Sequence, residues 1–112
     1  MSELINERCT ACRPDAPRVT GADVDELKPQ IPDWSMLERE GIDRLERTYS
    51  FGRYPDSVAF AMKVALLAEA EGHHPSILID FKRVTVTWWT HKIGGLHRND
   101  FIAAAKTDAL YA

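Results

Sequence analysis

Three histidines are the residues of this sequence best suited to acid–base chemistry. His73 and His74 are adjacent in the stretch EGHHPSILIDF, between a helix-like segment and a strand-like one, and His91 follows at the far end of a second strand-like run. An antiparallel strand pair would run out after His74 and back to His91, so both ends would lie at the same edge of the sheet. An imidazole can donate or accept a proton at neutral pH. The spacing therefore predicts a site at this edge.

The histidines could also have a structural role or bind a metal. In the structural role, His73 only follows a helix C-terminus, where a cation is favoured, and Pro75 stops the helix. The structural interpretation is the better one for any single histidine. It is less convincing for three histidines that lie at the same edge of the sheet. In the metal-binding role, His73 and His91 bind zinc with Cys9 and Cys12 of the stretch CTAC. Adjacent histidines usually point apart and no second CxxC pair follows, so the pattern disfavours zinc.

The composition is that of one globular domain. The 112 residues are 45% hydrophobic and 28% charged, and the net charge is −3, so no basic field points to direct binding of nucleic acid. No run is apolar for long enough to cross a membrane, and the start MSELINERC lacks the apolar core of a secretion signal. Two cysteines are too few for a disulfide scaffold. We therefore expect a cytoplasmic protein without a membrane partner.

The segments that must position the histidines are predicted to be three helices and four strands. Residues 1–19 show no period and are expected to form a loosely ordered N-terminal segment, while residues 20–112 form a single domain. The helices are expected within 20–28, 54–72 and 98–112, and the strands within 34–51, 76–81 and 83–91. We predict an α+β fold, a four-stranded antiparallel sheet with helices packed on one face, in the order α-β-β-α-β-β-α.

The central helix, Pro55–Ala70, is apolar on nearly every side. Pro55 suits its first turn, and Gly72 suits the left-handed residue after its last turn. Between residues 58 and 68 only Lys63 is polar. A helix of this kind is buried on more than one side. In so small a domain this predicts the sheet on one side and a second subunit on the other, in a homodimer or a homotetramer.

Several motifs together resemble the pterin-4a-carbinolamine dehydratase family, and in particular its bacterial members that accompany phenylalanine hydroxylase. The motifs are AEAEGHHP, VTVTWWTH and GGLHRND. At the family's spacings they contain Glu69, His73-His74-Pro75, Thr90-His91, Gly95-Leu96 and Asp100. The resemblance runs from about Thr20 to the C-terminus and leaves the first twenty residues out.

The resemblance implies a dehydratase, a hydro-lyase that acts on 4a-hydroxytetrahydropterin. Aromatic amino acid hydroxylases leave a hydroxyl group on C4a of their pterin cofactor, and removal of water gives quinonoid dihydropterin, which a reductase then recycles. The resemblance also implies that the histidines act without a metal and without a cofactor, because the pterin is the substrate. The catalytic residues that it implies are His73, His74 and His91. The substrate-binding residues are Glu69, Gly72, Trp89, Thr90, Lys92 and Asp100.

Some of these positions have ordinary alternatives. Glu69 lies one turn before His73 and could orient that imidazole, or it could be a solvated helix residue. Asp100 could serve the site or only cap the last helix. The three tryptophans could stack on a flat pterin, but at strand spacing they are more often core residues. Two positions depart from the family, because Ile77 stands where an aromatic residue is frequent and Lys92 where an acid is frequent.

Different functions are compatible with the same sequence. Some relatives act as dimerisation partners of a transcription factor, and an apolar helix would serve that role as readily as self-association. A regulator that contacts phenylalanine hydroxylase is a third possibility. The sequence leaves open which pterin side chain is used, which histidine is the acid and which the base, and whether the subunits form a dimer or a tetramer.

Overall fold

The sheet of this protein is four-stranded and antiparallel throughout. The computed structural model describes residues 3–9 and 18–111. In this part of the chain the strand order is β1-β2-β4-β3, so that the two strands of each hairpin are neighbours and β2 pairs with β4 across the middle. The strands are β1 Ser35–Arg39, β2 Ile42–Ser50, β3 Ser76–Ile79 and β4 Arg83–Trp88.

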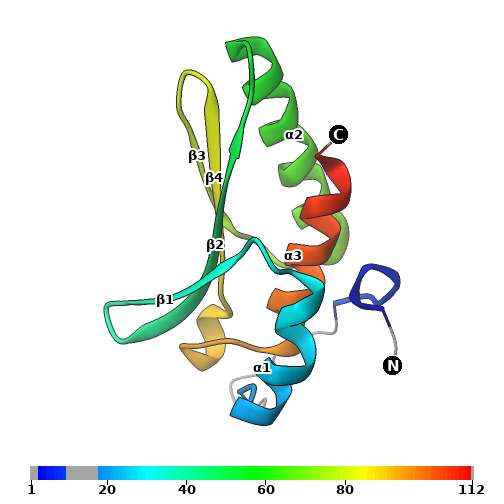
Figure 1. Cartoon of the computed structure of the whole chain (residues 1–112), viewed down its shortest axis with the longest axis vertical. Coiled ribbons are helices and arrows are strands. Elements are labelled where there is room, and N and C mark those ends of the chain that lie inside the picture. Colours follow the sequence, from blue (N-terminus) through cyan, green and yellow to red (C-terminus); the bar gives the residue numbers. More distant parts are fainter. Residues whose placement is uncertain (1–2, 10–17, 112) are drawn as a thin grey trace.

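Helices cover one side of this sheet (Figure 1). The long helix α2 and the last helix α3 pack on each other as well as on the strands, and α1 lies beside the first hairpin. The helices are α1 Gly21–Leu27, α2 Tyr54–Glu71 and α3 Arg98–Leu110, and short 3₁₀ turns occupy Leu4–Asn6, Lys28–Gln30 and His91–Ile93. The predicted α+β class and the predicted order of elements are confirmed. None of the helices in residues 3–9 and 18–111 is both long and apolar enough to span a membrane.

Local sequence explains where these elements begin and end. Thr20 caps α1 in a reciprocal capping box with Asp23, which satisfies two of the helix's free N–H groups. Glu40 and Gly41 form the β1–β2 turn with φ angles of 57° and 75°. Gly72 ends α2 with a φ of 65°, a left-handed conformation that costs glycine little and other residues more. The predicted hairpin turn and the predicted helix stop are therefore both present.

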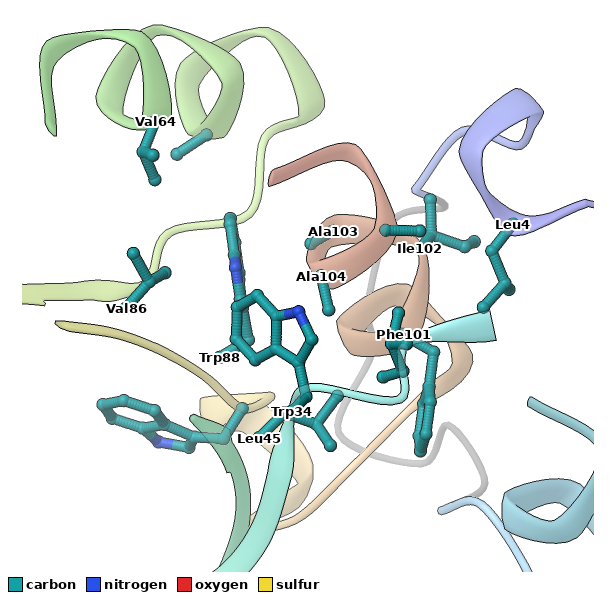
Figure 2. Packing of buried hydrophobic residues seen from close by; sticks show 14 of the residues in the cluster. Leu4, Trp34, Leu45, Val64, Val86, Trp88, Phe101, Ile102, Ala103 and Ala104 are labelled. Atoms are coloured by element: carbon teal, nitrogen blue, oxygen red, sulfur yellow. The ribbon is translucent and has the colours of Figure 1, made fainter. Parts of the chain in front are cut away.

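The core lies between the sheet and the helices (Figure 2). Alternate residues of β4 point into it, and Val84, Val86 and Trp88 are fully buried. Each such side chain contributes roughly 1.5–3 kcal/mol by leaving water. The strand ends at Trp88, three residues before the end of the run 83–91 that the sequence predicted. An isolated bridge between Thr90 and Gly95 closes the loop there, and His91 opens a 3₁₀ turn instead of ending the strand.

A polar cluster around Asp108 ties β2 to α3. The Oδ1 atom of Asp108 accepts hydrogen bonds from Trp34 Nε1 at 2.9 Å, from Arg47 Nη1 at 2.7 Å and from the Tyr49 hydroxyl. Arg47 also lies 3.7 Å from the carboxylate of Asp33. Burial and the hydrogen bond to Asp108 raise the pKa of Tyr49 well above its usual value. The charge of Arg47 is therefore compensated within the fold.

The described part of the N-terminal segment packs against α3. Leu4 is fully buried in the main core, and its backbone N–H donates to Gln30 Oε1. Glu7 accepts two hydrogen bonds from Arg98, at 2.8 and 2.7 Å. Much of the segment 1–19, for which loose order was predicted, lies outside the described residues, including the second cysteine of CTAC. The predicted domain boundary stays a prediction.

Candidate active site

A small polar cavity opens where α2 ends, β4 ends and α3 begins. Its volume is about 180 Å³. The structure brings the three candidate histidines together here, although His91 is separated from the other two along the chain by a whole strand pair. The cavity is lined by Gly72, His73, His74, Thr90, His91, Lys92 and Asn99. Six of these seven residues are among the nine that the sequence singled out.

His73 is the buried histidine of the site, and Asp100 holds it. The His73 Nε2 atom lies 2.6 Å from Asp100 Oδ1. The other carboxylate oxygen, Oδ2, accepts from the Thr90 hydroxyl at 2.8 Å and from the His97 backbone N–H at 2.9 Å. Asp100 itself is completely buried. Because the carboxylate accepts at Nε2, this nitrogen carries the hydrogen, and Nδ1 is left as the nitrogen that can exchange a proton.

A stacking contact on the face of the His73 ring also holds it in place. The ring stacks on Trp88 with a centroid separation of 5.2 Å and an angle of 27° between the planes. Trp88 in turn donates from Nε1 to the Thr107 hydroxyl on α3. The sequence offered Trp88 as a partner for a flat substrate, but this indole belongs to the core and supports the histidine instead.

His74 is at the solvent side of the cavity, paired with Glu69. The distance from His74 Nε2 to Glu69 Oε1 is 2.9 Å, and both side chains are largely exposed, so this pair contributes little to stability. Of the two alternatives for Glu69, the structure does not show the one that orients His73, because the exposed Glu69 carboxylate pairs with His74 instead. The left-handed Gly72 turns the chain after α2 so that His73 points towards α3 and His74 is left beside the last turn of α2.

His91 has a different kind of support. Its ring rests on the Trp89 indole, with the centroids 4.4 Å apart and the planes at 45°. Within residues 3–9 and 18–111, no hydrogen bond or ion pair involves its imidazole. The three histidines are thus held by a buried carboxylate, by an exposed carboxylate and by an aromatic ring.

Three predicted site residues do not line the cavity. Glu69, Trp89 and Asp100 each contact one of the histidines from behind. Asp100 also accepts the backbone N–H of His97 and so caps α3, which means that it both serves the site and caps the helix. Asn99 lines the cavity, and the sequence analysis missed it. Its place next to Asp100 in the first turn of α3 was the available signal.

Two further titratable groups, His97 and Cys9, are near the site but are not among the residues that line its cavity. Burial, together with the nearby His73, lowers the pKa of His97 against the opposing effect of Asp100, and its Nδ1 accepts the Asn99 N–H as a helix cap. Burial and the adjacent Glu71 raise the pKa of the Cys9 thiol to about 12. Cys9 therefore stays protonated at neutral pH. In the described ranges no group of three or more His, Cys, Asp or Glu side chains is placed to hold a metal ion, and absence of a metal stays a prediction.

Fold and site together define a small α+β domain that gathers three histidines at one end of an antiparallel sheet. Comparison with known proteins identifies the family. The family model described as pterin 4 alpha carbinolamine dehydratase matches residues 17–110. The chain therefore belongs to the pterin-4-alpha-carbinolamine dehydratase family.

Individual relatives agree with this assignment. A protein of Gloeobacter violaceus is 56% identical over 109 residues, covering 97% of this chain and 94% of that protein. A protein of Nitrosococcus oceani is 52% identical over 110 residues, covering 98% of this chain and 97% of that protein. Both carry provisional names as pterin-4-alpha-carbinolamine dehydratases.

Two solved structures share the fold. One is a transcriptional coactivator/pterin dehydratase from Brucella melitensis, with a TM-score of 0.77 and 27% identity, covering 86% of this chain and all of that one. The other is a pterin dehydratase-like protein identified as a RuBisCO assembly factor in the alpha-carboxysome, with a TM-score of 0.61 and 27% identity, covering 71% of this chain and 90% of that one.

Proposed function

We propose that this protein dehydrates a 4a-hydroxytetrahydropterin to the quinonoid dihydropterin. The observation that carries the proposal is the meeting of His73, His74 and His91 around one polar cavity, in a chain that belongs to a pterin dehydratase family. A binding module has no need of three imidazoles on one cavity. A separate reductase would then reduce the product to the tetrahydropterin that serves aromatic amino acid hydroxylases.

The reaction needs an acid and a base at the same time. The bond between C4a and the hydroxyl oxygen breaks, and the oxygen leaves as water after receiving a proton from a general acid. The proton on N5 passes to a general base, and the electron pair of the N5–H bond forms the C4a=N5 double bond. Each positioned acid or base contributes roughly 10²–10⁴-fold to the rate.

The surroundings of the histidines favour a division of roles. His73 is the proposed base, because the buried Asp100 carboxylate at Nε2 can stabilise the imidazolium that forms when Nδ1 takes the N5 proton. The exposed rings of His74 and His91 are then left to donate a proton to the leaving oxygen and to hold the pterin. Gly72, Thr90, Lys92 and Asn99 line the same cavity and are proposed to contact the substrate.

Enzyme assays test the proposal directly. The purified protein should accelerate decay of the 4a-carbinolamine absorbance in a phenylalanine hydroxylase reaction, measured against a no-enzyme control because dehydration also occurs uncatalysed. Replacing His73, His74 or His91 with alanine should lower kcat/KM by roughly 10- to 10⁴-fold, and added imidazole should restore part of the lost rate. His97→Asn is the matched control, since asparagine is also a good helix N-cap and the variant should keep full activity. An inactive wild-type protein would rule the proposal out.

The proposed chemistry uses no metal. Prolonged treatment with a chelator should therefore leave the rate of dehydration unchanged. Loss of activity on chelation, with recovery on adding zinc, would show that a metal is required.

A binding role is a second candidate, and one observation favours it. Tyr54, Val58, Met62 and Leu66 are spaced four residues apart along α2 and are all exposed. We call this row the α2 stripe. It could bind a second copy of the chain or another protein; the similar protein of Brucella melitensis is described as a transcriptional coactivator as well as a pterin dehydratase. An inactive wild-type chain that still associates through the α2 stripe would favour the binding role.

A further inference from the structure

Arg44 is a buried cation next to the candidate site, and none of the residues that the structure describes gives it a counter-charge. Its side chain enters from β2 and is only 9% exposed. The Nη2 atom donates to the carbonyl of Arg39 at 3.2 Å, while the buried Nε has no hydrogen-bond partner among residues 3–9 and 18–111. In the described chain no carboxylate lies within ion-pair distance of this guanidinium. Burying a charge in this way opposes folding, so packing alone does not account for an arginine here.

The guanidinium lies on the indole of Trp89. Its central carbon is 4.1 Å from the ring centroid, within the range of a cation–π contact. The strand register is consistent with the contact: the β2–β4 ladder ends with Leu45 paired to Trp88, and Arg44 and Trp89 are the next residues on the two neighbouring segments. Cross-strand neighbours of this kind fix each other's side chains.

Trp89 in turn contacts the imidazole ring of His91. The centroids of the indole and the imidazole are 4.4 Å apart, and this is the contact that orients the His91 ring, since within the described ranges no hydrogen bond or ion pair does so. His73 and His74 each have a carboxylate at hydrogen-bond distance. Arg44, Trp89 and His91 therefore form a stack that does for the third histidine what Asp100 and Glu69 do for the other two.

We propose that Arg44 is a positioning residue for His91, acting through Trp89. The guanidinium fixes the indole, and the indole holds the imidazole at the orientation that the reaction uses. Only the predicted effect of Arg44 on the reaction rate rests on the proposed dehydratase function. The effect on the His91 ring is independent of any activity.

Arg44→Met separates this role from a purely structural one. Methionine keeps the length and apolar contacts of the stem but removes the buried charge, so the melting temperature should be unchanged or higher. The kcat should fall by roughly 10- to 100-fold through misplacement of His91, with KM little altered. Arg44→Lys retains a charge without a flat stacking surface and should show an intermediate defect.

Arg47→Met is the matched control on the same strand. Arg47 also lies over an aromatic ring, that of Tyr49 at 4.4 Å, but it is paired with Asp108. Its loss should lower the melting temperature and leave kcat/KM unchanged at temperatures where the variant is folded. Arg44→Met should therefore lower activity without lowering the melting temperature, whereas Arg47→Met should lower the melting temperature without lowering activity.

A double-mutant cycle and a spectroscopic measurement complete the test. Trp89→Leu should reproduce the defect of Arg44→Met, and the double variant should be no worse than Trp89→Leu alone. In NMR spectra the ring protons of His91, assigned with His91→Gln, should be shifted by the indole in the wild type and should move towards the values of an exposed histidine in Arg44→Met.

The outcomes distinguish the two proposals. An inactive wild-type protein would refute the dehydratase function, and the His91 resonances would still decide the role of Arg44. Unchanged resonances in Arg44→Met, or a fall in melting temperature with a proportional loss of activity as in a structural variant, would overturn the inference.

Discussion

Asp100 is the carboxylate on which the buried half of the site depends. It faces His73 with one oxygen and accepts from Thr90 and the His97 backbone with the other. An aspartate so placed fixes the tautomer of the histidine and stabilises its protonated form. The same carboxylate also caps α3, so its position is set by the helix as well as by the site.

Asp100→Asn should lower kcat by roughly 10²- to 10⁴-fold. The amide can still accept the His97 N–H and cap α3, but it neither stabilises an imidazolium nor fixes the Nε2–H tautomer. The measurement is carbinolamine dehydration by the folded variant, with circular dichroism to verify the helix content. Activity within about twofold of the wild type would show that His73 does not rely on this carboxylate.

Cys9 gives a prediction for pH and reactivity. Its pKa of about 12 in the folded protein is above the ordinary value of 9.0, so the thiol stabilises the fold at pH values below about 9, and this stabilisation is lost as the pH rises from there towards 12. A Cys12→Ser variant isolates Cys9. At pH 8, iodoacetamide should modify it at least about 100-fold more slowly in the folded than in the urea-unfolded protein. Equal rates would contradict its burial as a neutral thiol.

At the scale of elements, the sequence predicts the fold well because its cues are local. The alternation that buries Leu45 and Tyr49 on β2 is readable from the pattern, as is the glycine that ends α2. The strand pair predicted that His73, His74 and His91 meet at one edge of the sheet, and the resemblance supplied the other site residues and the roles. The pairing of His74 rather than His73 with Glu69 depends on the backbone angle at Gly72, and the link from His73 to Asp100 spans 27 positions. Neither can be derived from spacing.

The first 3₁₀ turn is an element that the pattern did not indicate. Leu4 lies against α3, close to Ile102 (Figure 2). Leu4→Ala should therefore lower the free energy of unfolding by roughly 2–5 kcal/mol, as for other buried leucines, measured by urea denaturation. Ile5→Ala is the control, because the neighbouring Ile5 is exposed and its truncation should change stability little. Equal small effects would indicate a loosely held segment.

At the scale of the whole molecule, the α2 stripe is a row of apolar side chains that the described part of the chain leaves exposed. Met62 is 58% exposed and Leu66 is 64% exposed, and an apolar row of this length on one helix face is typical of a protein–protein contact. We predict that α2 forms an interface between copies of the chain, as its apolar sequence indicated.

Met62→Glu with Leu66→Lys should convert the protein to a monomer. Charged side chains on the α2 stripe would have to be desolvated in any interface built on it. Sedimentation velocity at micromolar concentration should show a dimer or tetramer for the wild type and a monomer for the variant. Lys63→Gln, on the side of α2 that faces the C-terminal residues, is the control and should keep the assembly. A wild-type monomer would refute the interface.

The burial of Leu4 beside α3 also bears on how the protein is made. Glu7 and Arg98, which pair across this contact, are 91 positions apart in the chain. On a ribosome, the 3₁₀ turn that carries Leu4 emerges long before the helix that covers it, and contacts so distant in sequence form slowly. In the nascent chain, Leu4 therefore cannot be buried against α3 until that helix has been synthesised.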